Sequence, residues 1–261
     1  MKGWLIYDKQ GAERNQWFIT RLQSEAAALG MTLLLRIFDG NERFFEEESP
    51  NFAIVRSILP TVNARLENRG IKVFNNAETA RVACDKWETY LLCKRLGIPV
   101  LDTALFSEYT GEYPRVIKSC NGHGGTEVFW ANNRNEAERF VQTDKRYIAQ
   151  QPSDILGEDT RIYALGERIV AAVKRTSTTD FKSNFSLGGS VELVQPTKEQ
   201  QEIVQALYKH LHFDFVGIDF LPYQDGIVLN EIEDAAGTRM LYRCSDIDMA
   251  KVFIQYIKER I

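Results

Sequence analysis

Three carboxylates lie close together in the stretch NEIEDAAG, residues 230–237, directly after the apolar run GIVL. They are Glu231, Glu233 and Asp234, and they occupy the place where a buried strand would normally end. A fourth carboxylate, Asp219, precedes them in VGIDF. Carboxylates in an otherwise apolar strand need a counter-charge, because burial otherwise shifts their pKa values until they are neutral.

The segment VGIDFLPYQDGIVLNEIE predicts a β-hairpin that brings these acids together. A three-residue loop, Gln224–Asp225–Gly226, places a glycine at the left-handed position that such loops favour. With this loop, Asp219 falls opposite Glu231. Glu233 points to the same side, because side chains alternate along a strand. A two-residue loop would shift the register and place another residue opposite Asp219.

Acids that face one another across a sheet destabilise it, so this arrangement favours a bound cation. Oxygen ligands without neighbouring cysteine or histidine favour a hard ion, Mg²⁺ or Mn²⁺, over zinc. Such a Mg²⁺ ion commonly shares the phosphates of a substrate. An edge hairpin whose acids face water explains the hairpin, taken alone, about equally well.

A glycine-rich loop provides a candidate phosphate site. The expected strand RVIKS delivers Lys118, and Gly122, Gly124 and Gly125 follow it. Glycines let backbone N–H groups approach an anion closely, and the lysine adds a positive charge. The order of residues differs from a Walker A loop, and a flexible turn is the alternative interpretation.

Further charged residues could complete such a site. Lys86 begins a helical segment in CDKWE, and Lys182 and Asn184 lie in the polar stretch DFKSN. A hairpin is expected over 159–175, with a two-residue turn at Gly166–Glu167. The side chains expected to share one face of it are Asp159, Arg161 and Lys174. Each alone fits a surface charge, but together the cations are those that a triphosphate and an acyl phosphate require.

The elements that must position these residues follow from the hydrophobic pattern. Alternating strands and helices at the beginning of the chain predict a parallel α/β unit. Its expected strands cover 3–7, 31–37, 51–57 and 71–76, and its expected helices cover 13–29 and 61–70. A single long helical segment is expected at 77–97, a small α+β subdomain at 112–151, and helices at 197–212 and 246–260.

Composition limits the function classes. The chain has 261 residues, 44% of them hydrophobic, and a net charge of −4, as in an ordinary globular protein. The acidic balance argues against nucleic-acid binding, and no apolar run predicts a membrane span or a signal peptide. The four cysteines and three histidines form no metal or disulfide pattern. Reduced thiols in a cytoplasmic protein are therefore expected.

The order of these pieces resembles the ATP-grasp superfamily, and more narrowly its RimK-like carboxylate–amine ligase branch. The resemblance is most specific over 147–237. There GEDTRIYALGERIVAAVKR, DFKSNFSLGG, VGIDF and NEIE follow the branch's D-x-R, F-[RK]-S-N, G-x-D and E-x-N blocks in order. It implies a combined α/β and α+β protein with the ATP-grasp fold. A preATP-grasp α/β domain at 1–80 would precede two lobes, at 81–149 and 150–261, that sandwich ATP.

The resemblance also implies an activity and roles for residues. An ATP-dependent ligase would join a carboxylate substrate to an amine acceptor through an acyl phosphate, on an amino acid, a peptide or a protein tail. Mg²⁺ or Mn²⁺ would be held by Asp219, Glu231 and Glu233. The nucleotide would be bound by Lys86, Lys118, Gly122, Gly124, Gly125, Gln150, Gln151 and Asp159. The reacting groups would be contacted by Arg161, Lys174, Arg175, Lys182 and Asn184.

The sequence differs from the branch's usual pattern at two places, both near the expected substrate site. Relatives commonly end the metal motif with Glu-x-Asn, whereas this chain has Glu-x-Glu-Asp, with Glu233 at the position of the asparagine. The following AAGTRMLY replaces a small, proline-containing stretch that lines the substrate. Asp234 is expected to cap a helix or loop.

Two other functions fit the same residues. One is a nucleotide-binding regulatory or carrier-binding module without ligase activity, and the other is an ATP-grasp kinase. The set of Lys86, Lys118, Asp219 and Glu231 argues against the module. No nucleic acid or membrane is expected as a partner, and the resemblance allows a homodimer.

Overall fold

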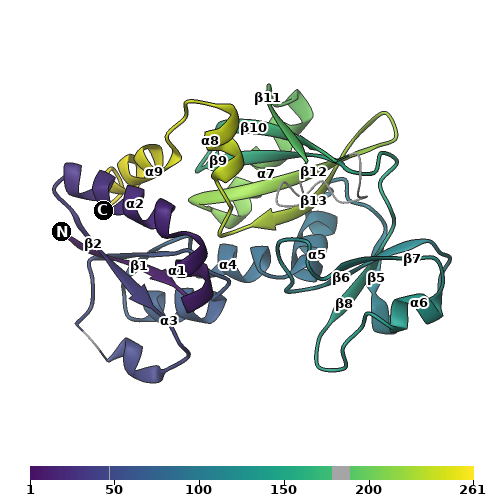
Figure 1. Ribbon diagram of the computed structural model, residues 1–261, viewed down its shortest axis with the longest axis horizontal. Coiled ribbons are helices and arrows are strands. Elements are labelled where there is room, and N and C mark those ends of the chain that lie inside the picture. Colours follow the sequence, from purple (N-terminus) through teal and green to yellow (C-terminus); the bar gives the residue numbers. More distant parts are fainter. Residues whose placement is uncertain (47, 178–188) are drawn as a thin grey trace.

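The computed structural model describes residues 1–46, 48–177 and 189–261. These residues form three sheets, which belong to an N-terminal domain, a small lobe and a C-terminal lobe (Figure 1). The predicted combination of α/β and α+β parts is confirmed. No helix among the described residues is long and apolar enough to cross a membrane.

The N-terminal domain is a four-stranded parallel sheet with the order β2-β1-β3-β4. Its strands are β1 (Lys2–Tyr7), β2 (Thr32–Ile37), β3 (Phe52–Val55) and β4 (Lys72–Phe74). Its helices are α1 (Lys9–Arg14), α2 (Gln16–Ala28), η1 (Glu42–Phe45) and α3 (Pro60–Asn68). The predicted start of the helix at 13–29 is wrong. Asp8 caps a separate helix, α1, by accepting from Gly11 N at 2.7 Å, and α2 begins only at Gln16.

Two helices replace the single long one expected at 77–97. They are α4 (Ala77–Ala83) and α5 (Lys86–Leu96), and Asp85 separates them by accepting from the backbone N of Trp87 and Glu88 at 2.9 and 3.3 Å. Aspartate followed three residues later by glutamate is a known signature of a helix start. This break puts Lys86 in the first turn of α5, where its backbone N donates to Cys120 O at 2.8 Å.

The small lobe is an antiparallel sheet with the order β5-β8-β6-β7 and its own buried cluster. Its elements are β5 (Thr103–Leu105), η2 (Phe106–Glu108), β6 (Arg115–Ser119), β7 (Val128–Ala131), α6 (Arg134–Glu138) and β8 (Tyr147–Gln150). The C-terminal lobe contains a five-stranded antiparallel sheet with the order β11-β10-β9-β12-β13. Its elements are β9 (Glu158–Leu165), β10 (Arg168–Thr176), β11 (Ser190–Val194), α7 (Lys198–Leu211), β12 (Phe215–Tyr223), β13 (Gly226–Glu233), α8 (Arg239–Cys244) and α9 (Met249–Lys258).

The register of the β12–β13 hairpin confirms one prediction and corrects another. The three-residue loop is wrong: Tyr223 pairs with Gly226, which leaves a two-residue turn. Asp219 nevertheless pairs with Glu231, as predicted, because a β-bulge follows at Asn230. An extra residue in one strand of an antiparallel pair shifts the register by one position, and here the shift compensates for the shorter turn.

A second bulge changes the face of β10. The predicted two-residue turn is confirmed, but the register shifts between Ile169 and Ala171, so Arg175 lies opposite Asp159 and Lys174 lies opposite Thr160. Residues directly opposite one another share a face. The prediction that Lys174 lies on the face of Asp159 is therefore wrong, and Arg175 takes that place.

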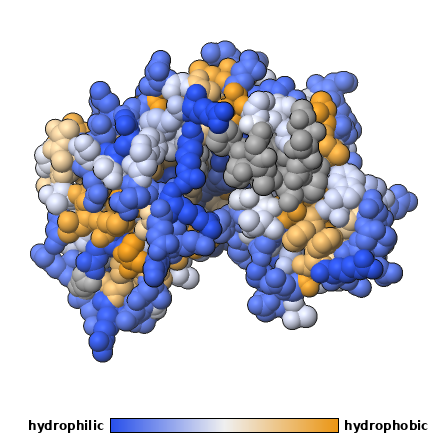
Figure 2. All heavy atoms as spheres, viewed as in Figure 1, coloured by the Kyte–Doolittle hydropathy of each residue, from blue (hydrophilic) through white to orange (hydrophobic). Residues whose placement is uncertain are grey.

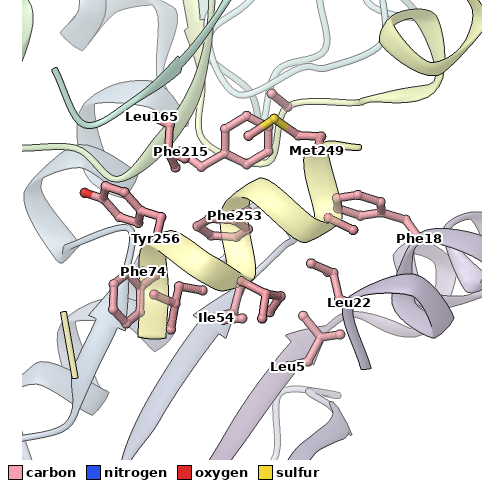
Figure 3. Packing of buried hydrophobic residues seen from close by; sticks show 14 of the residues in the cluster. Leu5, Phe18, Leu22, Ile54, Phe74, Leu165, Phe215, Met249, Phe253 and Tyr256 are labelled. Carbon is pink, nitrogen blue, oxygen red and sulfur yellow. The ribbon is translucent and has the colours of Figure 1, made fainter. Parts of the chain in front are cut away.

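The N-terminal domain and the C-terminal lobe share one hydrophobic core. Helix α9 lies between the two sheets, and Phe253 on it packs among residues of both units (Figure 3). The labelled residues of this cluster are Leu5, Phe18, Leu22, Ile54, Phe74, Leu165, Phe215, Met249, Phe253 and Tyr256. The two units are therefore fixed to one another by packing.

A buried carboxylate next to this core makes stability depend on pH. Asp214 accepts from Tyr256 Oη at 2.9 Å, and burial raises the pKa of Asp214 to about 6. A carboxyl with a raised folded-state pKa destabilises the fold when ionised, so its cost is absent at low pH and complete above about pH 6. We expect Asp214→Asn to stabilise the protein by about 1–3 kcal/mol at pH 8. The gain should shrink towards zero at pH 4 in urea titrations, and a gain independent of pH would contradict the assignment.

Candidate active site

A cavity of about 110 Å³ lies between the small lobe and the C-terminal lobe. Figure 2 shows the molecule hollowed between the N-terminal domain and the small lobe, below the C-terminal lobe. All eight residues predicted to bind the nucleotide line the 110 Å³ cavity, although they come from five separate segments. They are Lys86, Lys118, Gly122, Gly124, Gly125, Gln150, Gln151 and Asp159.

Two lysines line this cavity, one from β6 and one from the start of α5. Strand β6 places Lys118, whose Nζ donates to Gln150 Oε1 at 2.6 Å and to Asn230 Oδ1 at 2.8 Å. Burial lowers the pKa of Lys118 to about 8, although the charge of Glu231 acts in the opposite direction. Lys86 Nζ lies 3.2 Å from Glu231 Oε2 and also donates to Gly122 O. Both cations therefore lie where a polyphosphate could displace their protein partners.

The glycine-rich loop needs glycine at two positions. Gly124 and Gly125 have φ values of +64° and +72°, which only glycine adopts without strain. A Cβ atom at Gly124 would meet no other atom within 4 Å. Glycine is therefore needed there for its backbone conformation and not because a side chain would clash. The loop lines the same cavity as the two lysines.

The predicted metal ligands come together at one end of the β12–β13 hairpin. Asp219, Glu231 and Glu233 each offer a carboxylate oxygen, and these oxygens lie within 4.8 Å of one another. Three hard oxygen donors at this separation suit Mg²⁺ or Mn²⁺. The residues present therefore fit a divalent ion of the predicted kind.

Two buried arginines pair with two of these carboxylates and hold Asp219 in its charged form. Arg161 donates from Nε and Nη2 to the two oxygens of Asp219, each at 2.7 Å, and its Nη1 lies 2.6 Å from Glu233 Oε2. Arg175 also donates to Asp219 at 2.7 Å and forms a two-pronged pair with Asp159. Burial alone would raise the pKa of Asp219, but the two arginines hold it well below its usual range. Burial raises the pKa of Glu233, and Arg161 opposes that rise.

A second cavity, of about 620 Å³, lies between the N-terminal domain and the C-terminal lobe. Arg161 lines it, as do Arg56 and Ser57 after β3. The two cavities meet at a shared wall, which consists of Lys86, Gly122, His123, Gly124, Arg175, Glu231 and Glu233. The candidate metal ligands Glu231 and Glu233 therefore face both cavities.

Asp234 does not cap a helix or loop, as was expected, but bonds to a side chain of the N-terminal domain. It is buried and accepts from Asn75 Nδ2, and the nearest following helix, α8, begins after Thr238. The prediction of a helix or loop cap is wrong. Asn75 also accepts from Asp214 N and Phe215 N at 2.6 and 2.8 Å, so it links the end of β4 to the C-terminal lobe.

The remaining predicted residues lie elsewhere. Lys174 points to the other face of β10, and its Nζ lies 2.8 Å from Glu158 Oε1. Lys182 and Asn184 lie outside the described residues. Sequence reasoning missed three residues that line the 110 Å³ cavity: Asn230 and the apolar pair Ile155 and Leu156, which are 51% and 47% exposed. Two large apolar residues inside the loop SDILGE were the available signal.

The family model described as a RimK-like ATP-grasp domain matches residues 84–257, which is most of the chain. The chain belongs to the RimK-like ATP-grasp family. It is 28% identical over 264 residues to the uncharacterized protein MG011 of Mycoplasma genitalium, with 98% of this chain and 92% of that protein covered. It is 27% identical over 229 residues to a probable alpha-L-glutamate ligase of Histophilus somni, with 78% and 77% covered.

Solved structures share the fold of this RimK-like protein. The D-alanine–D-alanine ligase of Bacillus anthracis with ATP has a TM-score of 0.76 at 16% identity, with 99% of this chain and 96% of that chain covered. The ATP-grasp ligase PsnB with a precursor variant, Mg and ADP has a TM-score of 0.69 at 13% identity, with 99% and 98% covered. The predicted ATP-grasp fold is thereby confirmed. The chain is an ATP-dependent carboxylate–amine ligase, as its sequence predicted.

The arrangement of β10 predicts different costs for two neighbouring cations. Arg175→Gln removes one counter-charge from buried Asp159 and Asp219, and we expect it to cost about 3 kcal/mol or more of unfolding free energy. Lys174→Gln is the matched control, because this half-exposed lysine pairs with Glu158 on the other face. Its cost should be about 0–1 kcal/mol. Equal costs in urea unfolding would show that the bulge does not place Arg175 as described.

Proposed function

We propose that this RimK-like ligase attaches an amino acid to an amino-acid or peptide substrate, with the nucleotide in the 110 Å³ cavity and the substrates in the 620 Å³ cavity. The observation that carries the proposal is the wall that the two cavities share, where Glu231 and Glu233 face both. A phosphoryl group leaving a nucleotide on one side would there meet a carboxylate on the other. Glutamate is the first amino acid to test, since a relative is named for it.

The reaction follows from this placement. A carboxylate oxygen of the substrate attacks the γ-phosphorus of ATP, and ADP leaves, which gives an acyl phosphate. The amine nitrogen of the acceptor then attacks the acyl carbon, phosphate leaves, and the nitrogen loses a proton to form the amide. No protein nucleophile is needed, because positioning and charge neutralisation supply the catalysis.

The residues that line the two cavities have different roles in this reaction. Lys86 and Lys118 neutralise the phosphates, and the loop with Gly124 leaves room for them. Arg175 lines both cavities, so it can hold the acyl phosphate. Arg161 lines the second cavity, pairs with Asp219 and Glu233, and helps to keep Asp219 charged. Lys174 has no part here, because it points to the other face.

We assign the metal to Asp219, Glu231 and Glu233. A bound Mg²⁺ ion supplies positive charge next to the phosphate oxygens, and Mn²⁺ has the same preference for oxygen ligands. Four free cysteines, three of them buried, support the predicted cytoplasmic setting. The homodimer stays a prediction.

The proposed activity can be tested directly. The protein is incubated with ATP, Mg²⁺, glutamate and a peptide library, and phosphate release and product masses are measured. An amide product with ADP and phosphate supports the proposal. A phosphorylated product without an amide would instead indicate a kinase, and nucleotide binding without turnover would indicate a regulatory module.

The metal assignment predicts the loss of ATP turnover in Asp219→Asn with Glu231→Gln. Two ligands then lose their charge, and we expect ADP formation to fall by about 100-fold or more. Asp219 also pairs with two arginines, so Glu231→Gln alone is tested in parallel with a thermal melt. Asp225→Asn, in the exposed hairpin turn, is the control. Unchanged turnover in both site variants would refute the assignment.

Glu233→Asn restores the residue that relatives commonly have at this position. An amide oxygen can replace one carboxylate ligand, so we expect ligase activity to persist while the affinity for the metal falls about 10-fold. Calorimetry and the dependence of the rate on Mg²⁺ and Mn²⁺ measure both quantities. Loss of all turnover would mean that Glu233 has a part beyond coordination.

A further inference from the structure

Strand β13 presents two consecutive residues to the 110 Å³ cavity. Side chains alternate along a regular strand, so neighbours point to opposite faces. Here Asn230 and Glu231 both line the cavity, while Leu229 before them and Ile232 after them belong to one buried cluster. The reason is the β-bulge, which adds Asn230 to the strand as an extra residue. The bulge therefore puts one more polar side chain on the cavity side of β13.

This added side chain meets Lys118, which comes from the small lobe. Lys118 on β6 is 8% exposed, and its Nζ donates to Asn230 Oδ1 at 2.8 Å. A lysine only donates hydrogen bonds, so the Asn230 amide must turn its oxygen towards it. The bond joins the small lobe to the C-terminal lobe inside the cavity that both residues line.

A second amide holds the same ammonium from within the small lobe. Gln150 Oε1 accepts from Lys118 Nζ at 2.6 Å, and Gln150 Nε2 donates to Thr103 Oγ1 at 3.2 Å. Thr103 Oγ1 donates in turn to Leu101 O at 2.9 Å. A chain of hydrogen bonds thus fixes the orientation of the Gln150 amide. The ammonium is held between two amide oxygens, which use two of its three donors.

Both acceptors are neutral, and this decides how the ammonium can act on an anion. A buried ammonium needs hydrogen-bond partners, because burying it without them is costly. A carboxylate would satisfy Lys118 and would also cancel much of its charge. An amide satisfies it and leaves the charge in place for phosphate oxygens. The residue that the bulge places beside Lys118 is such an amide, although two glutamates, Glu231 and Glu233, follow it in NEIE.

From these contacts we infer that Asn230 is a positioning residue, which holds the Lys118 ammonium towards the phosphates of the nucleotide and leaves its charge available to them. The inference rests on the proposed function, because that function puts the nucleotide in the 110 Å³ cavity. A residue with a purely structural role would only have to satisfy Lys118. Aspartate would do that at least as well as asparagine, so the two roles predict different results.

The variant Asn230→Asp separates the two roles. Its carboxylate pairs with Lys118, so the melting temperature without nucleotide should equal or exceed that of the unsubstituted protein. The same carboxylate cancels charge that the phosphates need, so we expect the affinity for ADP to fall about 30-fold. The affinity for adenosine, which has no phosphate, should change by less than about 3-fold. Calorimetry measures both affinities, in Mg²⁺ and again in EDTA.

The matched control is Asn68→Asp, at the exposed end of α3, which should leave the affinity for ADP unchanged. Unchanged ADP affinity in Asn230→Asp would overturn the inference, because asparagine would then serve only to satisfy Lys118. A loss of affinity in Mg²⁺ but not in EDTA would overturn it too, since the carboxylate would then act through the metal. Equal losses for ADP and adenosine, with a lower melting temperature, would indicate a damaged fold and would contradict the assignment.

A second substitution tests whether Asn230 acts through Lys118. Asn230→Leu keeps a side chain of similar size and removes its amide, and it should weaken ADP binding about 5-fold. In a Lys118→Met background the same change should weaken binding by less than about 2-fold, because the positioned group is gone. An equal loss in both backgrounds would refute a positioning role.

Kinetic measurements separate this inference from the function on which it rests. If the protein forms an amide, Asn230→Asp should raise the KM for ATP about 30-fold and leave the KM for the amino-acid substrate within about 2-fold. Amide formation with an unchanged KM for ATP would refute the role of Asn230 and leave the ligase proposal standing. If no amide forms with any substrate, the ligase proposal fails, and the ADP and adenosine affinities still decide the role of Asn230.

Discussion

The balance of buried charge within the C-terminal sheet is the constraint on which the site depends. Asp219 is 1% exposed, and it stays ionised because Arg161 and Arg175 reach it from the neighbouring strand β9 and from β10 beyond. Around it, the carboxylates of Asp159, Asp219, Glu231 and Glu233 are matched in formal charge by Lys86, Lys118, Arg161 and Arg175. A divalent ion alone would therefore enter a region that is already neutral. A nucleotide brings negative charge with it, so the ion and the nucleotide favour one another's binding.

Two β-bulges make this balance geometrically feasible. The bulge in β10 turns Arg175 towards Asp159 and Asp219, and sends Lys174 to the other face. The bulge at Asn230 restores the pairing of Asp219 with Glu231 and offers an amide oxygen to Lys118. Each bulge moves one residue from one face of the sheet to the other, so without them the charges would not converge.

Features set by local sequence were predicted correctly, whereas features set by bulges and by distant packing were not. The alternation of strands and helices and the glycine loop were readable, because hydrophobic period and turn chemistry are local properties. The pairing of Asp219 with Glu231 was predicted from the wrong turn, and it is correct because the bulge at Asn230 compensates for the shorter loop. Lys174 was misplaced because a bulge leaves no mark in hydrophobic alternation. Asp234 was misread as a cap because its partner, Asn75, is 159 residues away and is brought there only by packing. The capping signature from Asp85 to Glu88 was present but was outweighed by the long helical pattern around it.

The packing of the three units gives the two cavities different mechanical properties. Most of the second cavity is walled by the N-terminal domain and the C-terminal lobe, which share the core around Phe253 and are also linked by Asn75. That part of the cavity is fixed by packing, whereas Gly122, His123 and Gly124 of the glycine-rich loop close its remaining side. The 110 Å³ cavity has one wall from the small lobe, whose sheet packs around a buried cluster of its own. Polar contacts link the two sides of this cavity: Lys118 Nζ donates to Asn230 Oδ1 at 2.8 Å, Gln151 Nε2 donates to Tyr223 Oη at 3.0 Å, and Leu229 N donates to Pro99 O at 2.9 Å. A lobe with its own core can move as a unit, so a change in the shape of the 110 Å³ cavity would come from the small-lobe side, where only polar and edge contacts must change.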